Sequence, residues 1–270
     1  MSNIKVGVVG ALGKMGREVV KAVFDNETME LVLAVDMFNV GCDIGEIVLN
    51  KRIDVKIESD LCHAIESKDV DVIVDFTQPS SIYNNAKKIL NSNVNLVIGT
   101  TGLNDEQLEE LKNLTYENHV SALIAPNFST GAVLLMMFSK MAAKYFDNAE
   151  IIELHHNQKK EAPSGTAIIK TAKMIASVKD NFEKGNCEEV ELIDGARGAK
   201  ADSNVRIHSV RMPGFIASEE VIFGENGQIL TLRHDSMNRE CYMKGVLLSI
   251  DYVYKHKEFV YGLENILSFN

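Results

Sequence analysis

The sequence lacks several features that would place a protein in a membrane or in an oxidising compartment. No apolar run is long enough to span a bilayer, and the first residues carry no apolar signal-peptide core. The four cysteines lie far apart and form no C-x-x-C pair, which favours reduced thiols in a cytosol; they are Cys42, Cys62, Cys187 and Cys241. We therefore expect a cytoplasmic protein that does not bind membranes.

Positive charge is also scarce. Lys and Arg number 28 against 38 Asp and Glu, which gives a net charge of −10. A chain this acidic, with no basic block, is poorly suited to nucleic acid or to an anionic membrane surface. An anionic ligand would need a local cluster of cations. The 270 residues are 46% apolar and 24% charged, a globular composition that allows one large domain or two smaller ones.

The first 125 residues alternate between short apolar strands and amphipathic helices. Strands are predicted over residues 4–9, 31–35, 70–74, 94–98 and 120–124, and helices over residues 14–24, 81–90 and 105–113. This alternation favours βαβ units and a parallel sheet. The strands are apolar at nearly every position, as expected when both faces of the sheet are covered. We predict an α/β fold with an N-terminal Rossmann-type, doubly wound parallel sheet.

Beyond Pro126 the pattern changes to that of a central α+β domain. Helices are predicted over residues 129–145 and 164–177, strands over 150–155, 205–210, 219–223 and 229–234, and mostly loop over 180–202. Glu225-Asn226-Gly227 is a turn signal, so the last two strands should form an antiparallel hairpin. A final helix over residues 239–255 has two possible places, because a doubly wound sheet often needs a further covering helix.

A glycine-rich segment, Gly10-Ala11-Leu12-Gly13-Lys14-Met15-Gly16, joins the first strand to the first helix. Glycines let backbone N–H groups approach a pyrophosphate, and the helix N-terminus adds positive potential. The spacing is G-x-x-G-x-x-G rather than G-x-G-x-x-G, so the interpretation depends on the strand before it and the helix after it. The alternative is an ordinary glycine turn.

Asp36 ends the second predicted strand, where a carboxylate can accept hydrogen bonds from a ribose diol. The same carboxylate would repel a 2′-phosphate, and neighbouring Met37 carries no compensating charge. We therefore expect NADH to bind at least as well as NADPH. The alternative is a solvated carboxylate without a ligand.

Three further loops follow strands of the same predicted sheet. They are Asp75-Phe76-Thr77, Gly99-Thr100-Thr101-Gly102 and Ala125-Pro126-Asn127-Phe128. Ligands of doubly wound sheets lie outside the carboxyl ends of the strands, so the first two loops are candidates for the nicotinamide half of the cofactor. The third is a candidate hinge and cofactor contact. Ordinary turn chemistry is the alternative for the Thr- and Gly-rich loops.

The densest chemistry lies between Glu153 and Thr166. It contains His155, His156 and Lys159, and Pro163-Ser164-Gly165-Thr166 then opens a helix. Free N–H groups and hydroxyls at a helix start suit a carboxylate. Histidine titrates near neutral pH and lysine adds a donor and a fixed charge, which together predict a pocket for a small anion beside a proton donor. The alternative is a simple helix cap. We predict no metal site, because no third ligand lies at helical spacing.

Taken together, these segments resemble the 4-hydroxy-tetrahydrodipicolinate reductase family, the dihydrodipicolinate reductases of lysine and diaminopimelate biosynthesis. The resemblance extends over nearly the whole chain, and its specific part is the block H-H-x-x-K-x-x-A-P-S-G-T that begins at His155. It implies a dinucleotide-binding domain over residues 1–126 and 238–270. It also implies a domain over residues 127–237 that binds the substrate and builds a homotetramer.

The resemblance implies a role for individual residues as well. The cofactor residues are Gly10, Ala11, Leu12, Gly13, Lys14, Met15, Asp36, Gly99, Thr100, Thr101, Ala125, Pro126, Asn127 and Phe128; the catalytic pair is His155 and Lys159; and the substrate contacts are His156, Ser164, Gly165 and Thr166. The sequence departs from the family pattern at Met37, at Lys160-Glu161, and at residues 211–214 and 218–220. We expect none of these departures to touch the catalytic pair.

The implied reaction is the NAD(P)H-dependent reduction of a small cyclic imine dicarboxylate that has lost water from its hydroxyl-bearing carbon. Hydride addition at ring C4 produces an enamine, and Lys159 is the candidate proton donor, with His155 positioning it or sharing the role. Because cofactor and substrate lie on different domains, we expect closure to exclude water. The alternatives are another two-domain amino-acid or semialdehyde dehydrogenase, or a non-catalytic NAD-binding module. The last would not need His155 and Lys159 together.

Overall fold

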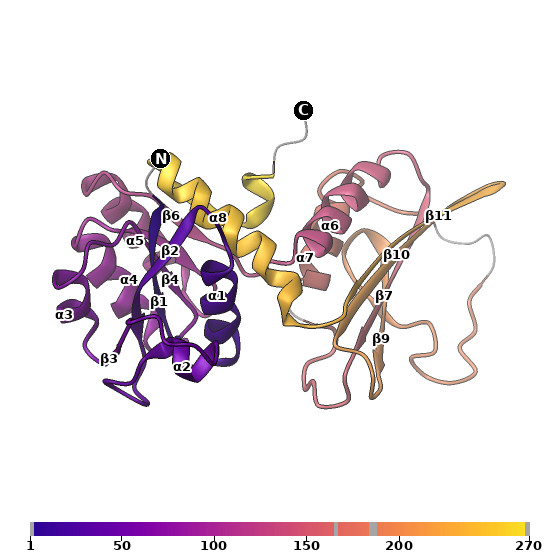
Figure 1. Ribbon diagram of the computed structural model, residues 1–270. Helices are drawn as coiled ribbons and strands as arrows, with labels where there is room; N and C mark the ends of the chain where they lie inside the picture. The colour runs from indigo at the N-terminus through magenta and orange to yellow at the C-terminus, as the bar shows by residue number, and fades with distance from the viewer. Residues whose placement is uncertain (1–2, 165–166, 184–187, 268–270) are drawn as a thin grey trace. The chain divides into compact units, whose positions relative to one another are not determined.

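The protein folds into two compact units, which the computed structural model describes over residues 3–164, 167–183 and 188–267 (Figure 1). Unit 1 comprises Met1–Phe128 and Tyr242–Asn270, and unit 2 comprises Ser129–Cys241. The chain therefore leaves the first unit, builds the second, and returns to the first for its last segment.

Unit 1 is built on a seven-stranded parallel sheet in the order β12-β6-β5-β4-β1-β2-β3. The strands are β1 (Ile4–Val9), β2 (Met29–Val35), β3 (Ile57–Glu58), β4 (Val72–Asp75), β5 (Asn95–Ile98), β6 (Ala122–Ile124) and β12 (Phe259–Tyr261). The strand order reverses at β1, with β2 and β3 to one side and β4 to β6 to the other. Ligands of doubly wound sheets bind at such a switch point, outside the carboxyl ends of the strands.

Helices cover this sheet, and every residue of β4, β5 and β6 is buried. The helices are α1 (Lys14–Phe24), α2 (Ile44–Val48), α3 (Leu61–Glu66), α4 (Ile82–Asn91), α5 (Asp105–Glu117) and α8 (Met243–Lys255). α3 packs on α4 and α4 on α5, whereas α1 packs on α8. The C-terminal helix α8 lies against β4, β5 and β6, so it belongs to the core of unit 1.

Unit 2 holds a mixed sheet in the order β11-β10-β7-β9-β8. Its strands are β7 (Asn148–His155), β8 (Ala199–Lys200), β9 (Arg206–Arg211), β10 (Ala217–Glu225) and β11 (Gln228–Ser236). β7 runs antiparallel to β10 and parallel to β9. Helices α6 (Thr130–Ala142) and α7 (Ala167–Ala176) pack on each other, and alternate residues of β7 are buried in the core that they share with the sheet.

The predicted fold class is confirmed by a parallel α/β unit followed by a mixed α+β unit. The hairpin predicted from the turn signal is also confirmed: β10 and β11 pair in register around Gly227, whose φ is +87°. The sequence did not predict α2, α3, β3 or β12, which span only two to six residues. Elements this short carry too few residues for a periodic pattern. Within the described residues, no helix is long and apolar enough to cross a membrane.

Candidate active site

The glycine-rich loop makes its turn at Gly10, at the end of β1. Gly10 has φ of +77°, and a Cβ there would lie 2.8 Å from the carbonyl oxygen of Phe76. Any other side chain would therefore be strained and would push against backbone. α1 then begins with Gly13 as its N-cap, which offers no side chain to cover the N–H groups of the first turn. Among the described residues no side chain caps these amides, which leaves them available to an anion.

Asp36 holds the end of β2 against this loop. Its carboxylate accepts a hydrogen bond from the N–H of Leu12 at 2.8 Å and another from the N–H of Phe38 at 3.2 Å. Each oxygen keeps a lone pair for a further donor. The neighbouring side chains of Met37 and Phe38 are 75% and 73% exposed. Asp36 is thus fixed where a diol could meet it, with apolar groups beside it.

A cavity of about 980 Å³ opens along the switch point of the unit 1 sheet. Its lining includes Gly10, Leu12, Gly13, Lys14, Met15, Asp36, Met37, Phe38, Phe76, Thr77, Ser81, Asn85 and Lys88. Six of the predicted cofactor residues are among these, while Ala11 is buried beneath the loop. The Gly10 cradle, the uncapped helix start and the fixed carboxylate fit a dinucleotide.

The other predicted cofactor loops meet at the same edge of the sheet without lining this cavity. A Cβ at Gly99 would overlap the ring of Phe76, and the rings of Phe76 and Phe128 are 5.7 Å apart between centroids. Phe76 therefore joins the cavity wall to the ends of β5 and β6. Thr100 is buried, and its hydroxyl has no hydrogen-bond partner among the described residues. A buried hydroxyl without a partner is costly, so the Thr100 hydroxyl is a candidate ligand contact. Of the other predicted residues in these loops, Thr101 is exposed, Pro126 and Asn127 are half-buried, and Ala125 is buried.

A buried carboxyl behind the cavity fixes one of its walls. Asp75 is fully buried, and it accepts hydrogen bonds from the N–H and hydroxyl of Thr77 at 2.8 and 2.6 Å and from the Asn85 amide at 3.0 Å. Burial raises the pKa of Asp75, although its bonds to Thr77 and Asn85 oppose this. Sequence reasoning found Thr77 but missed Asn85 and Lys88. The polar positions 81, at the N-cap of α4, and 85 and 88, on the helix, were the available signal, because they share one helix face.

In unit 2, His155 at the end of β7 is held by a carboxylate. Its Nδ1 is hydrogen-bonded to Glu153, whose side chain is fully buried. The other Glu153 oxygen accepts from the Arg211 guanidinium at 2.7 Å and from the N–H of Ser164 at 3.2 Å. Burial raises the pKa of Glu153, but the hydrogen bonds from Arg211, Ser209 and His155 together bring it below its usual range. Glu153 is therefore a carboxylate that orients the imidazole.

The same surroundings keep His155 neutral. Burial lowers its pKa, and the charges of Lys159 and Arg211 lower it further, which outweighs the opposing bond to Glu153. With Nδ1 donating to the carboxylate, Nε2 of the neutral ring is an acceptor. His155 can therefore orient a donor or accept a proton through Nε2.

Lys159 lies on the loop that follows β7. Its ammonium is 3.1 Å from the carboxylate of Glu161, which is 72% exposed. An ion pair with so exposed a partner is weak, so a substrate carboxylate can replace Glu161. His156 is exposed, and its Nδ1 accepts from the N–H of Gln158 at 3.2 Å. Ser164 is buried, whereas the predicted contacts Gly165 and Thr166 lie outside the described residues.

The expectation that the family departures avoid the catalytic pair is wrong. Glu161 pairs with Lys159, and the N–H of Met212 donates to the carbonyl of His155 at 3.0 Å. Arg211 binds Glu153 and also donates to the Glu161 carbonyl at 2.6 Å. Sequence separation hid the contacts of Arg211 and Met212, because β9 runs parallel to β7 and places Arg211 opposite His155.

Comparison with known proteins decides what kind of enzyme carries this site. The models of the dihydrodipicolinate reductase N-terminus and C-terminus match residues 4–128 and 131–267. The 4-hydroxy-tetrahydrodipicolinate reductases of Picosynechococcus sp. and Listeria innocua are 52% and 49% identical, over 99% and 98% of this chain and 99% and 100% of theirs. This chain belongs to the dihydrodipicolinate reductase family. The family predicted from the sequence is confirmed.

Solved structures agree with this membership. A dipicolinate-bound dihydrodipicolinate reductase from Paenisporosarcina sp. TG-14 is 46% identical with a TM-score of 0.88, covering 98% of this chain and 100% of that one. An amine dehydrogenase from Mycobacterium smegmatis has a TM-score of 0.72 at 13% identity and covers 100% of this chain and 97% of its own, a likeness of fold alone. A similar fold thus occurs beyond the dihydrodipicolinate reductase family.

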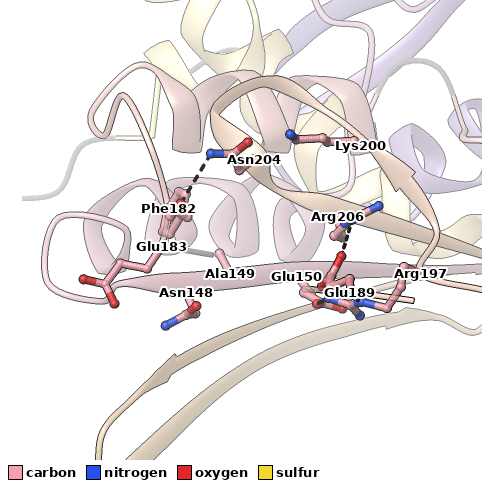
Figure 2. Close-up of a pocket in the computed structure, with 10 residues that line it drawn as sticks. All are labelled: Asn148, Ala149, Glu150, Phe182, Glu183, Glu189, Arg197, Lys200, Asn204 and Arg206. Atoms are coloured by element: carbon pink, nitrogen blue, oxygen red, sulfur yellow. Dashed lines mark hydrogen bonds and ion pairs between the residues drawn. The ribbon is translucent and has the colours of Figure 1, made fainter. Parts of the chain in front are cut away.

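A second hollow of about 340 Å³ lies at the other end of β7, beside Asn148 and Glu150 (Figure 2). Its guanidinium groups already have carboxylate partners: Arg197 binds Glu150 at 2.7 Å, and Arg206 binds Glu189 at 2.8 Å. These cations are neutralised and lie at the opposite end of the strand from His155. The hollow is therefore a poor candidate for the dicarboxylate site of a dihydrodipicolinate reductase.

Proposed function

We propose that this chain catalyses the NAD(P)H-dependent reduction of 4-hydroxy-tetrahydrodipicolinate, through dihydrodipicolinate, to tetrahydrodipicolinate in the cytoplasm. The reaction belongs to lysine and diaminopimelate biosynthesis, and the chain is an oxidoreductase. The observation that carries the proposal is the imidazole of His155, oriented by buried Glu153, four residues before Lys159 in a member of this family.

The dinucleotide would be held by unit 1. Its pyrophosphate would meet the glycine-rich loop at the N–H groups of Lys14 and Met15, which open α1, and its adenosine ribose would donate to Asp36. The residues after β5 and β6, Gly99 to Thr101 and Ala125 to Phe128, would border the nicotinamide. When bound, the reduced nicotinamide supplies a hydride to the substrate ring.

The dicarboxylate substrate would be held by unit 2. Lys159 and His156 would supply positive or donor groups, and Ser164 with Gly165 and Thr166, which precede α7 in the sequence, would supply N–H groups and hydroxyls. Hydride gain leaves an enamine that must be protonated on carbon. Lys159 carries that proton, and neutral His155 positions the ammonium or shares the transfer.

A direct assay tests the reaction and its coenzyme preference. The condensation product of pyruvate and aspartate semialdehyde should drive oxidation of NADH, with a KM for NADH no higher than that for NADPH, because Asp36 repels a 2′-phosphate.

The variant Asp36→Asn tests the coenzyme preference. It keeps an acceptor oxygen for the N–H of Leu12 but loses the negative charge. We expect it to shift the ratio of kcat/KM toward NADPH by about tenfold, the worth of one charged hydrogen bond. No oxidation with either coenzyme would refute the function, and a strong NADPH preference of the wild type would refute the coenzyme assignment.

We propose that the chain assembles as a homotetramer through the sheet of unit 2. β11 is an edge strand, and Ile229 on it is 76% exposed. An open edge with exposed apolar side chains favours pairing with another chain. Light scattering should give four times the mass of the chain, and Ile229→Lys should shift the population to smaller species. A monomeric wild type at micromolar concentration would contradict this.

A further inference from the structure

A row of titratable side chains crosses the interior of unit 2. Glu219 on β10 is paired with Glu153 on β7 and with His234 on β11. Directly paired residues point to the same face of a sheet and place their Cβ atoms about 4.5–5.5 Å apart. The neighbouring row on this face is apolar and consists of Ile151, Val221 and Leu232. The polar row is thus an exception in the core.

Glu219 is the least satisfied member of this row. It is 4% exposed, and its Oε1 has no hydrogen-bond partner among the described residues. The hydroxyl of Thr171, which is fully buried on α7, bonds the carboxyl. Within the described part of the chain, no Lys or Arg pairs with Glu219. A buried carboxyl without a cation calls for an explanation.

The groups that face Glu219 come from four elements. Glu153 lies on β7 and His234 on β11, while α7 presents Thr171. α6 begins beside His234: the ring lies over Gly131, and its Nε2 is 3.2 Å from the hydroxyl of Ser129. Among these groups, Glu153 links Glu219 to the proposed active site, because Glu153 is hydrogen-bonded to both His155 and Arg211.

This environment makes Glu219 change charge near neutral pH. Burial raises the pKa of Glu219 to about 7, and the charge of Glu153 adds to the rise against the opposing Thr171 bond. An ionised Glu219 therefore places a second negative charge beside the carboxylate that orients the imidazole. Negative charge in a poorly solvated interior favours a protonated histidine.

We propose that Glu219 is a positioning residue, which acts through Glu153 to set the charge state of His155 as its own carboxyl gains or loses a proton. This inference rests on the role proposed above for His155 in the reaction. Glu219 touches neither substrate nor cofactor in this scheme. It couples the protonation of the site to the pH of the surroundings.

The test compares the wild type with Glu219→Gln, which keeps the shape and removes the charge. Histidine ring signals are followed by NMR across neutral pH, with His155 assigned from the spectrum of His155→Gln. We expect Glu219→Gln to lower the apparent pKa of His155 by about half a unit or more, and to move the pH profile of kcat/KM in the same direction. Glu219→Asp, which keeps the carboxyl, should behave like the wild type.

The matched control is Glu220→Gln. Glu220 is the next residue on β10, faces the other side of the sheet and pairs with Arg233 at 2.8 Å. Both readouts should be unchanged in this variant. If Glu219→Gln does not fold, Thr171→Val takes its place. Loss of the hydroxyl removes a bond that lowers the pKa of Glu219, so His155 should again titrate differently.

A folded Glu219→Gln whose His155 titration superimposes on that of the wild type would overturn the inference and make Glu219 a packing residue. An unchanged titration in Thr171→Val would overturn it likewise. A moved titration with an unmoved rate profile supports the coupling and instead contradicts the proposed role of His155. The two proposals can therefore fail separately.

Discussion

Replacing Lys159 by alanine is expected to lower kcat by about 10²–10⁴-fold, the usual contribution of a positioned proton donor. The enamine formed by hydride gain needs a proton, and the ammonium of Lys159 is the group proposed to supply it. The Kd of NADH should stay within a few-fold of the wild type, because the cofactor cavity is lined by residues of unit 1 and Lys159 belongs to unit 2. Steady-state kinetics and NADH fluorescence titration measure the two effects.

Lys160→Ala is the matched control for this variant. Lys160 is the next residue, carries the same charge and is exposed. Its loss changes the net charge as much as the loss of Lys159 does, so near-wild-type turnover in Lys160→Ala assigns the effect to position 159. Near-normal turnover in Lys159→Ala would remove Lys159 from the mechanism.

Glu153→Gln is expected to lower the free energy of unfolding by about 3–5 kcal/mol at pH 7, since it leaves Arg211 without its buried counter-charge. The side chain of Glu153 is fully buried, and that of Arg211 is 20% exposed. Glutamine has one acceptor oxygen where Glu153 has two, so it cannot accept from both Arg211 and His155, and kcat should fall in the same variant. Urea denaturation and steady-state kinetics check the two expectations.

The stability difference between the wild type and Glu153→Gln should decrease as the pH falls. The folded-state pKa of Glu153 lies below its ordinary value of 4.5, because the bonds from Arg211, Ser209 and His155 outweigh burial. The stability that Glu153 contributes is therefore fully present above about pH 4.5 and is lost as the pH falls through the lower folded-state value. The difference between wild type and Glu153→Gln should shrink over that acidic range.

The same strand provides a control. Glu150 also pairs with an arginine and a histidine, Arg197 and His208, each at 2.7 Å, but its side chain is 36% exposed. Glu150→Gln should cost less than about 1 kcal/mol, because solvent screens exposed ion pairs. Equal losses in the two variants would show that burial does not decide the strength of the Glu153 network.

Local patterns in the sequence predicted much of the secondary structure of unit 1. Apolar runs gave β1, β2, β4, β5 and β6, and the alternation with amphipathic helices gave the parallel sheet. The glycine loop and Asp36 could also be proposed as a phosphate loop and a ribose acceptor, since the two lie in one βαβ unit. The elements that escaped prediction, such as α2 and α3, are short helices whose N-caps, Asp43 and Asp60, accept hydrogen bonds from backbone N–H groups.

The proposed catalytic pair could be named from the sequence for a similar reason. His155 and Lys159 stand four residues apart in one conspicuous polar block, and the resemblance to a family named their roles. Glu153 lies in the same block, but the sequence predicted no role for it. Arg211 and Met212 lie among the departures from the family pattern and have no role predicted from the sequence, although Arg211 binds Glu153 and Met212 binds the His155 carbonyl.

Local sequence was thus enough to predict the longer strands, most helices, the glycine-rich loop and the polar block, because each depends on residues that are near neighbours in the sequence. Strand pairing settled the rest: β9 beside β7 brings Arg211 to Glu153, and β10 beside β7 brings Glu219 to the same carboxylate. These partners are 58 and 66 residues apart, and register depends on how whole faces pack. The charge state of His155 follows from that register, since burial and neighbouring charges arise only when the sheet has formed.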